Sequence, residues 1–367
     1  MIKQISSKHS AMIRTLQRIC LCSALLLIAA PVKAQQEIRF GVLGLFHPHE
    51  LEIEPELGQV LSVIANGNAD TSALVLNGEP GRRQLLFRAE DSRVVAGSRS
   101  ASSWTITARN GGAVAFRLIV PGKFHRVYWA RLTIEARNGE LLAVASMDRE
   151  TAVASIVAAE MDETAPIEAL KAQAVATRSF LASGQKHLDF DFCDTTHCQF
   201  LKSPPPLASR VSSAVQATRG LVIEYRSKPL AAMYSSRCGG HTHSLRDVGL
   251  ESGKNADESY PYFAVPCAWC RKHPFAWRSS IGGNGHALKP GDERQRIVAA
   301  RQWGWSAIPS SDFTATEDSS GWQLEGHSVG HSVGMCQHGA IGMAASGASF
   351  REILSHYYPN TLLISQP

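Results

Sequence analysis

The hydrophobic pattern of the chain changes its period near Asp148. Over residues 38–144, apolar and polar residues alternate in short runs separated by Asn-Gly or Pro-Gly pairs, which is typical of β-strands joined by tight turns. After Asp148, apolar residues recur at helical spacing, which predicts one helix over 151–161 and a second over 166–183. Strands first and helices afterwards predict an α+β fold.

Residues suited to helix ends bound both predicted helices. The side chain of Asp148 can accept hydrogen bonds from the first backbone N–H groups of the first helix. Pro166 suits the first position of the second helix, and Gly184 suits its end. Glu160 therefore lies in the last turn of the first helix.

The first 34 residues have the three parts of a secretory signal. A basic start without acidic residues precedes an apolar run over 19–30 and a small-residue exit at Ala34. The 12 residues of the run would extend about 18 Å as a helix, short of the roughly 30 Å hydrocarbon core of a membrane. We therefore expect cleavage after Ala34, export to the periplasm or the extracellular cell wall, and no stable membrane insertion of the mature chain.

The charge balance excludes one class of partner. The formal net charge of +5 comes from five basic residues in the first 34, and 32 basic and 32 acidic residues follow. An electroneutral mature chain offers no electrostatic basis for binding nucleic acid. A hydrophobic content of 44% is enough for a large core, which excludes a disordered or fibrous chain.

Six cysteines follow the predicted signal, and two of them lie in a dense group of potential metal ligands. His187, Cys193, His197 and Cys198 fall within twelve residues. Two imidazoles and two thiolates can close a tetrahedral zinc site, which would be structural because it leaves no open position. A disulfide between Cys193 and Cys198 is equally compatible with an exported chain.

The other four cysteines are Cys238, Cys267, Cys270 and Cys336. They could form disulfides in one of three pairings, or a single metal site with four thiolate ligands. Export favours disulfides. A nucleophilic role for Cys336 would require His331 or His338 as a base, and adjacency in sequence does not establish that geometry.

Glu160 has the surroundings of a general acid. The apolar residues 156–159 and Met161 flank it, and burial among them would raise its pKa so that it holds a proton near neutral pH. The local sequence by itself favours the alternative, an exposed carboxylate at a helix end. A glycine-rich segment over 326–340 offers backbone and His, Ser and Gln side chains that could bind sugar hydroxyls or form a structural turn.

Several blocks of sequence occur in a characteristic order. They are Glu160-Met161, 166–178, 193–199, 217–221, 234–242, 330–337 and 357–361. Together they resemble the stage II sporulation protein D family, also called the SpoIID/LytB or amidase-enhancer domain. The match extends from about Phe116 to the C-terminus. It predicts a mixed helix/strand catalytic domain over 116–367 with a substrate cleft, after a β-rich region over 35–115.

The resemblance implies an exported lytic transglycosylase that acts on the glycan strands of bacterial peptidoglycan. It implies that Glu160 is the catalytic acid, that catalysis uses no cofactor, and that a structural zinc is held by His187, Cys193, His197 and Cys198. The residues that would contact the glycan are Gln173, Arg178, Tyr234, Ser236, His331 and Gln337. The chain departs from the family pattern at Ser332 and His338, which bears on the shape of the cleft.

The carboxylates of the sequence fit this reaction. Most glycosidases need two carboxylates, and no partner for Glu160 stands out. A lytic transglycosylase needs one, because the C6 hydroxyl of N-acetylmuramic acid (MurNAc) attacks C1. Two alternatives use other chemistry: a non-catalytic glycan-binding enhancer of a cell-wall N-acetylmuramoyl-L-alanine amidase, and a zinc or cysteine hydrolase.

Overall fold

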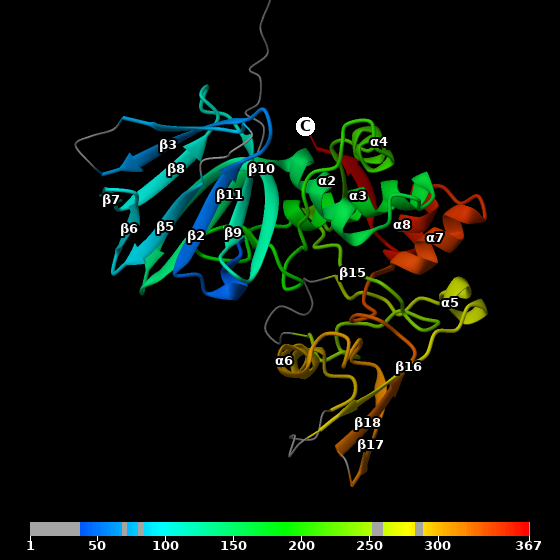
Figure 1. Cartoon of the computed structure of the whole chain (residues 1–367). Coiled ribbons are helices and arrows are strands. Elements are labelled where there is room, and N and C mark those ends of the chain that lie inside the picture. Colours follow the sequence, from blue (N-terminus) through cyan, green and yellow to red (C-terminus); the bar gives the residue numbers. More distant parts are fainter. Residues whose placement is uncertain are drawn as a thin grey trace, which may run out of the picture. The chain divides into compact units, whose positions relative to one another are not determined.

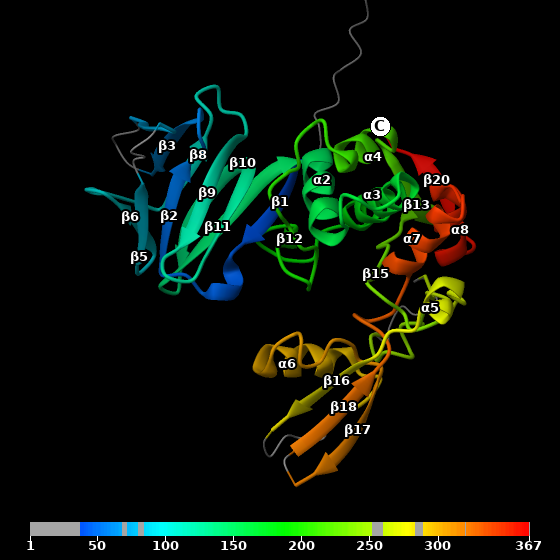
Figure 2. The same cartoon turned by 45° about the vertical axis from the view of Figure 1, so that its right-hand side comes forward.

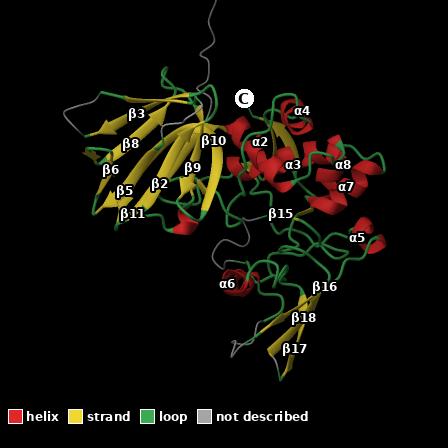
Figure 3. Ribbon diagram, in the orientation of Figure 1, coloured by secondary structure: helices red, strands yellow, loops and turns green. Residues whose placement is uncertain are grey.

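The computed structural model describes residues 37–67, 72–79, 84–251, 260–282, 289–319 and 321–366. The predicted signal peptide and its cleavage site lie outside these residues. Strand exceeds helix, and the predicted α+β class is confirmed (Figure 3). Within the described ranges, we find no helix with the length and apolar character that a membrane span requires.

A curled sheet occupies the N-terminal part of the described chain (Figures 1 and 2). Its central path runs in the order β12-β1-β11-β10-β9-β2-β5-β6-β7, with β8 paired to β10 and β3, and β4 paired to β3. The strands are β1 (Glu37–Val42), β2 (Glu50–Pro55), β3 (Val60–Asn66), β4 (Leu74–Asn77), β5 (Leu85–Glu90), β6 (Arg93–Ala96), β7 (Arg99–Ala101), β8 (Ser103–Thr107), β9 (Val114–Val120), β10 (Phe124–Arg137), β11 (Glu140–Asp148) and β12 (Phe192–Cys193). A short 3-10 helix, Gly44–Phe46, follows β1.

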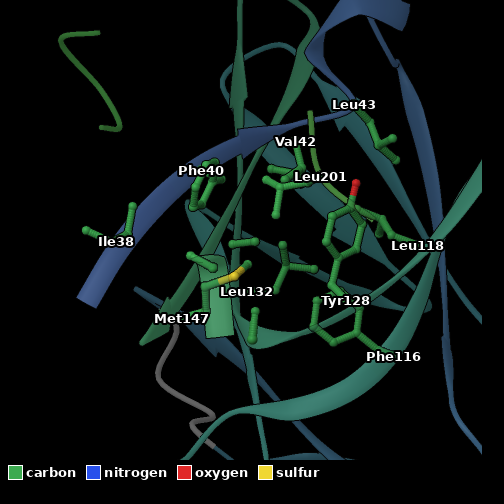
Figure 4. Close-up of a cluster of buried hydrophobic side chains, with 14 of the residues drawn as sticks. Ile38, Phe40, Val42, Leu43, Phe116, Leu118, Tyr128, Leu132, Met147 and Leu201 are labelled. Carbon is green, nitrogen blue, oxygen red and sulfur yellow. The ribbon is translucent and has the colours of Figure 1, made fainter. Parts of the chain in front are cut away.

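The alternation of apolar and polar residues that predicted strands appears in the structure as an alternation of buried and partly buried side chains. In β9 every second side chain is buried, and the C-terminal half of β10 follows the same pattern. Side chains of β1, β9, β10 and β11 point toward one another in the core, among them Phe40, Phe116, Tyr128 and Met147 (Figure 4). The division expected between residues 115 and 116 falls inside β9, in the middle of this sheet.

The two predicted helices are confirmed as α2 (Arg149–Glu160) and α3 (Ile167–Ala182). Asp148 ends β11 and also caps α2, so the strand passes directly into the helix. Pro166 occupies the N-cap of α3, whereas the first helical position was expected, so the helix begins one residue later, at Ile167. Gly184 follows the end of α3 at a φ of 112°, which favours glycine. This arrangement puts Glu160 at the end of α2.

Smaller elements complete the fold. They are α4 (Arg210–Ala217), β13 (Leu221–Tyr225), β14 (Lys228–Pro229), β15 (Tyr234–Ser235), α5 (Ala268–Lys272), β16 (Trp277–Ile281), α6 (Glu293–Trp303), β17 (Phe313–Asp318), β18 (Gly321–Gly326), β19 (Met335–Cys336), α7 (Gln337–Ala345), α8 (Phe350–Tyr357) and β20 (Leu362–Ser365). β13 lies between β14 and β20, β18 lies between β16 and β17, and β15 pairs with β19 in parallel. Both α7 and α8 pack on α3.

The contribution of the α2 N-cap to stability can be tested by mutation. The Asp148 carboxylate accepts hydrogen bonds from the backbone N–H groups of Glu150 (3.1 Å) and Thr151 (3.0 Å). We expect Asp148→Ala to lower the free energy of unfolding by about 1 kcal/mol, because both donors lose their acceptor. Asp148→Asn, which keeps an acceptor oxygen, should lose less. Urea unfolding measures both, and equal stability of Asp148→Ala and the wild type would contradict the assignment.

Candidate functional site

Glu160 ends α2 with its side chain half-buried. Burial raises the pKa of its carboxyl group from 4.5 to about 6, because a desolvated carboxylate is penalised. Hydrogen bonds from the Phe200 backbone N–H and the Gln337 side chain oppose this rise, as does the positive charge of Lys202. The carboxyl group can therefore hold a proton close to neutral pH and also be stabilised after releasing it.

Gln337 and Gln173 connect three helices beside Glu160. Gln337 begins α7, and its Nε2 donates to the backbone carbonyl of Glu160 at 3.1 Å and to Oε1 of Gln173 at 3.4 Å. Gln173 lies on α3 and donates to the hydroxyl of Thr177 at 3.3 Å. The two amides thus fix α2, α3 and α7 around one polar site.

Tyr234 adds a phenol group to this site. Its hydroxyl donates a hydrogen bond to Oε1 of Gln199. Burial raises the pKa of Tyr234 well above its usual value, and the negative charge of Glu160 raises it further. The phenol therefore keeps its proton and donates it to Gln199 close to the carboxyl group.

The structure brings four of the predicted residues together, namely Glu160, Gln173, Tyr234 and Gln337. His331 is half-buried beside the Tyr234 backbone, and its Nδ1 accepts a hydrogen bond from the Val333 N–H at 3.0 Å. Burial lowers the pKa of His331 to about 4, so its imidazole is neutral at neutral pH. Ser236 is half-buried in the same strand region, and its carbonyl accepts from the His338 N–H at 3.1 Å.

Arg178 has a different role from the one expected. Its side chain is completely buried, and its guanidinium donates to both carboxylate oxygens of Glu150 at 2.8 and 2.7 Å. It also donates to the Leu221 carbonyl at 3.1 Å. The group is thus already engaged within the protein and presents no surface to a glycan. We assign it to holding α3 against α2 and β13.

The predicted metal ligands converge as expected. His187, Cys193, His197 and Cys198 place their ligand atoms within 4.8 Å of one another. The separations between the nitrogen and sulfur atoms of neighbouring pairs are 3.2, 3.4 and 3.7 Å. A tetrahedral zinc with ordinary Zn–N and Zn–S bonds places such atoms roughly 3.6 Å apart, so the set fits zinc.

The edge of the curled sheet holds this loop. β12 pairs with β1 in parallel, which places Cys193 opposite Gly41. The next residue, Asp194, is buried and accepts hydrogen bonds from Arg126 at 2.9 Å and Tyr128 at 3.1 Å. The carboxylate thus ties the ligand loop to β10.

Sequence reasoning missed the residues that this loop supplies to the site. Gln199 and Phe200 directly follow Cys198, and they contact Tyr234 and Glu160 respectively. Gln199 belongs to the sequence block 193–199, but no role was predicted for it. The hydrogen bond from the Phe200 backbone N–H could not be predicted from the residue type, because a backbone N–H does not depend on the side chain.

The expected disulfides are not confirmed. All six cysteines among the described residues are unpaired. The sulfur atoms of Cys238, Cys267, Cys270 and Cys336 instead form one buried cluster within 4.8 Å. None of these four sulfurs is bonded to another.

A pocket of about 390 Å³ lies among residues of α5, α7 and α8, and its lining includes Trp269, Met343 and His356. None of the predicted glycan-binding residues lines it. A substrate cleft beside Glu160 therefore stays a prediction.

Comparison with known proteins bears on the family. The sequence model described as stage II sporulation protein, SpoIID, matches residues 137–225, which contain Glu160 and the four predicted zinc ligands. Stage II sporulation protein D of Bacillus subtilis is 25% identical over 275 residues, covering 60% of this chain and 75% of that protein. Residues 137–225 of this chain thus match the SpoIID family.

Two further proteins are similar to this chain over more than half of its length. An uncharacterised protein of Brachyspira hyodysenteriae is 28% identical over 267 residues, covering 63% of this chain and 70% of that protein. The amidase enhancer of Bacillus subtilis is 23% identical over 284 residues, covering 57% of this chain and 40% of that protein.

The structural role of the Arg178–Glu150 ion pair can be tested by measuring stability. We expect Arg178→Met to lower the free energy of unfolding by about 3–5 kcal/mol, because it leaves the Glu150 carboxylate unpaired in a largely buried position. Arg246→Met is the matched control, since its ion pair with Glu251 is exposed and should contribute about 0–1 kcal/mol. Thermal or urea unfolding compares the two, and similar losses would refute the structural role.

Proposed function

We propose that this protein is an exported lytic transglycosylase of the SpoIID family that cleaves the glycosidic bond between MurNAc and N-acetylglucosamine (GlcNAc) in peptidoglycan. The observation that carries the proposal is the Glu160 carboxyl group, half-buried among hydrogen-bond donors, with a pKa raised to about 6. A general acid works best when its pKa lies near the working pH. The match of residues 137–225 to the SpoIID family, and the similarity to an amidase enhancer, support a role at the cell wall.

Glu160 performs both proton transfers in this mechanism. The protonated carboxyl group gives its proton to the glycosidic oxygen, and the bond between that oxygen and C1 of MurNAc breaks. The C6 hydroxyl of the same sugar attacks C1 and forms the 1,6-anhydro ring. The Glu160 carboxylate accepts the proton that this hydroxyl loses, so the enzyme returns to its starting state without consuming water.

The neighbours of Glu160 suit this cycle. When the carboxylate forms, the Phe200 N–H and the Gln337 amide donate to it and stabilise its charge. Tyr234 keeps its proton and donates it to Gln199, and neutral His331 accepts from the Val333 N–H, so both side chains support the surroundings of Glu160. Gln337 offers an amide group of the kind that binds hydroxyl and N-acetyl groups, whereas Gln173 is completely buried and orients the Gln337 amide.

The two acidic residues that follow Glu160 most closely in sequence, Asp162 and Glu163, accept hydrogen bonds from other residues. The Asp162 carboxylate accepts hydrogen bonds from Thr164, and the Glu163 carboxylate accepts one from the Arg210 N–H. A second carboxylate that activates water is the requirement of hydrolytic glycosidases. Their engagement favours the single-carboxylate, water-independent reaction.

A structural zinc would be held by His187, Cys193, His197 and Cys198. Four protein ligands close the coordination sphere, so the ion would bind no substrate and supply no catalytic step. Its effect would be to fix the loop that carries Gln199 and Phe200 to the site. Catalysis in this proposal uses no cofactor.

A second function rests on the name of one relative, the amidase enhancer. In that role the protein would bind glycan strands and stimulate a cell-wall N-acetylmuramoyl-L-alanine amidase without cleaving the glycan. The two functions differ in one respect that is simple to measure: the enhancer alone releases nothing from peptidoglycan.

Glu160→Gln tests the catalytic proposal. This change keeps the volume and polarity of the side chain but removes the exchangeable proton, so release of anhydro-muropeptides should fall by about 10²–10⁴-fold. Glycan binding and the unfolding midpoint should stay close to wild type. Glu163→Gln, at an exposed carboxylate three residues away, is the matched control. Equal release by Glu160→Gln and the wild type would exclude Glu160 as the acid.

The pH profile gives an independent test. Because the acid must be protonated, kcat/KM should be highest below about pH 6 and fall about tenfold per pH unit above it. Lys202→Met removes a cation that favours the carboxylate, so the Glu160 pKa should rise and the fall should move upward by roughly a few tenths of a pH unit.

The exposed position of Lys202 permits a control on this shift. High salt should shrink the difference between Lys202→Met and the wild type, because solvent ions screen an exposed charge. Lys228→Met, at an exposed lysine on β14, should leave the profile unchanged. A downward shift for Lys202→Met would contradict the electrostatic account.

A further inference from the structure

A second group of potential metal ligands consists of cysteines alone. Cys238 follows β15, Cys267 and Cys270 belong to the N-cap and body of α5, and Cys336 ends β19 and caps α7. All four are buried, with at most 5% of their surface exposed. Their sulfur atoms lie within 4.8 Å of one another, although they come from three separate segments.

The spacing of these sulfurs suits one metal ion. With Zn–S bonds of about 2.3 Å, a tetrahedral site places its sulfurs roughly 3.8 Å apart. The sulfurs of Cys270 and Cys336 are 3.6 Å apart. An iron–sulfur cluster would spread its four cysteines more widely, because several irons and sulfides lie between them. A disulfide requires about 2.05 Å, and no pair among these described cysteines is bonded.

The surroundings of the cluster provide hydrogen bonds to sulfur. The Gly339 backbone N–H donates to Sγ of Cys336 at 3.3 Å, at the start of α7. The Tyr357 hydroxyl lies 3.5 Å from Sγ of Cys267, where it can donate to a thiolate. A Cβ at position 339 would come within 2.7 Å of the Cys267 sulfur, so the close approach requires glycine. Such donors stabilise the negative charge of metal-bound thiolates.

Basic residues flank the same cysteines. One divalent zinc and four thiolates together leave two negative charges, which favour cations nearby. Arg237 directly precedes Cys238, and Arg271 and Lys272 directly follow Cys270. The side chain of Arg271 packs against Gly240, next to the Cys238 segment. The charges adjacent to the cluster therefore have the sign that a tetrathiolate site needs.

We propose that Cys238, Cys267, Cys270 and Cys336 bind a single zinc ion as four thiolates. The site is structural, because the four sulfurs complete a tetrahedron and leave no position for water or substrate. It is separate from the site of His187, Cys193, His197 and Cys198, so a fully loaded chain holds two zinc ions. The proposal is independent of the chemistry at Glu160.

The position of this ion explains how two short strands are kept together. β15 and β19 pair over two residues each, Tyr234 with Met335 and Ser235 with Cys336. A pairing this short needs support, and the ion would bind both strands to α5, which packs on α7 (Figures 1 and 2). Cys336 directly precedes Gln337, whose amide reaches Glu160. The tetrathiolate site thus positions Gln337 and Tyr234 from one direction, as the histidine-containing site positions Gln199 and Phe200 from another.

Metal analysis of the mature full-length chain tests the proposal. The protein should be exported, purified without reductant or chelator, and measured by mass spectrometry for elemental zinc. We expect two zinc ions per chain in the wild type and one in Cys270→Ser. Cys198→Ser is the matched control, since it should also lose one ion, but from the other site. Glu160→Gln should keep both ions, which separates this result from any test of catalysis.

A measurement on the wild-type protein tests the proposal even if the cysteine variants do not fold. X-ray absorption at the zinc edge should give about three sulfur ligands per zinc on average, against two if only the histidine-containing site is filled. Two sulfurs per zinc, unchanged zinc content in Cys270→Ser, or iron in place of zinc would overturn the proposal. So would an intact mass that shows these four cysteines joined in disulfides.

Discussion

The desolvation of one carboxyl group is the physical constraint on which the site depends. A carboxylate at the end of α2 would titrate near its ordinary pKa if water reached it freely, and it would then be a poor proton donor near neutral pH. Burial raises the pKa of Glu160 to about 6, while Phe200, Gln337 and Lys202 keep the rise moderate. The balance leaves a group that can release its proton and take it back.

That balance requires segments far apart in sequence to meet within hydrogen-bond distance. The sheet passes directly into α2 through Asp148, and the loop after Cys198 brings the Phe200 N–H to the carboxyl group. The start of α7 brings Gln337. Both supplying segments begin next to a cluster of potential metal ligands, one at Cys198 and one at Cys336. With zinc bound as we propose, the two clusters would perform a similar task, which is to fix short, irregular backbone where helices and long strands do not.

Sequence patterns predicted the elements that depend on local chemistry. The period change at Asp148 follows from side-chain alternation, and the start of α2 follows from the Asp148 acceptor. The bounds of α3 follow from Pro166 and Gly184, and all these features are present. The role of Arg178 could not be read this way, because its partner Glu150 lies on another helix and their contact is tertiary. The cysteines were expected to pair because export was predicted, whereas their clustering depends on how β15, α5 and β19 pack.

The fate of water is the most direct test of the account. Purified mature protein would be incubated with intact glycan strands in heavy-oxygen water, and the new saccharide ends would be weighed by mass spectrometry. The account predicts 1,6-anhydro ends without heavy oxygen, because the C6 hydroxyl of the substrate attacks C1. Heavy oxygen at the new reducing ends would show hydrolysis, and an absence of new ends would show a protein that does not cleave the glycan. Either result would contradict the mechanism.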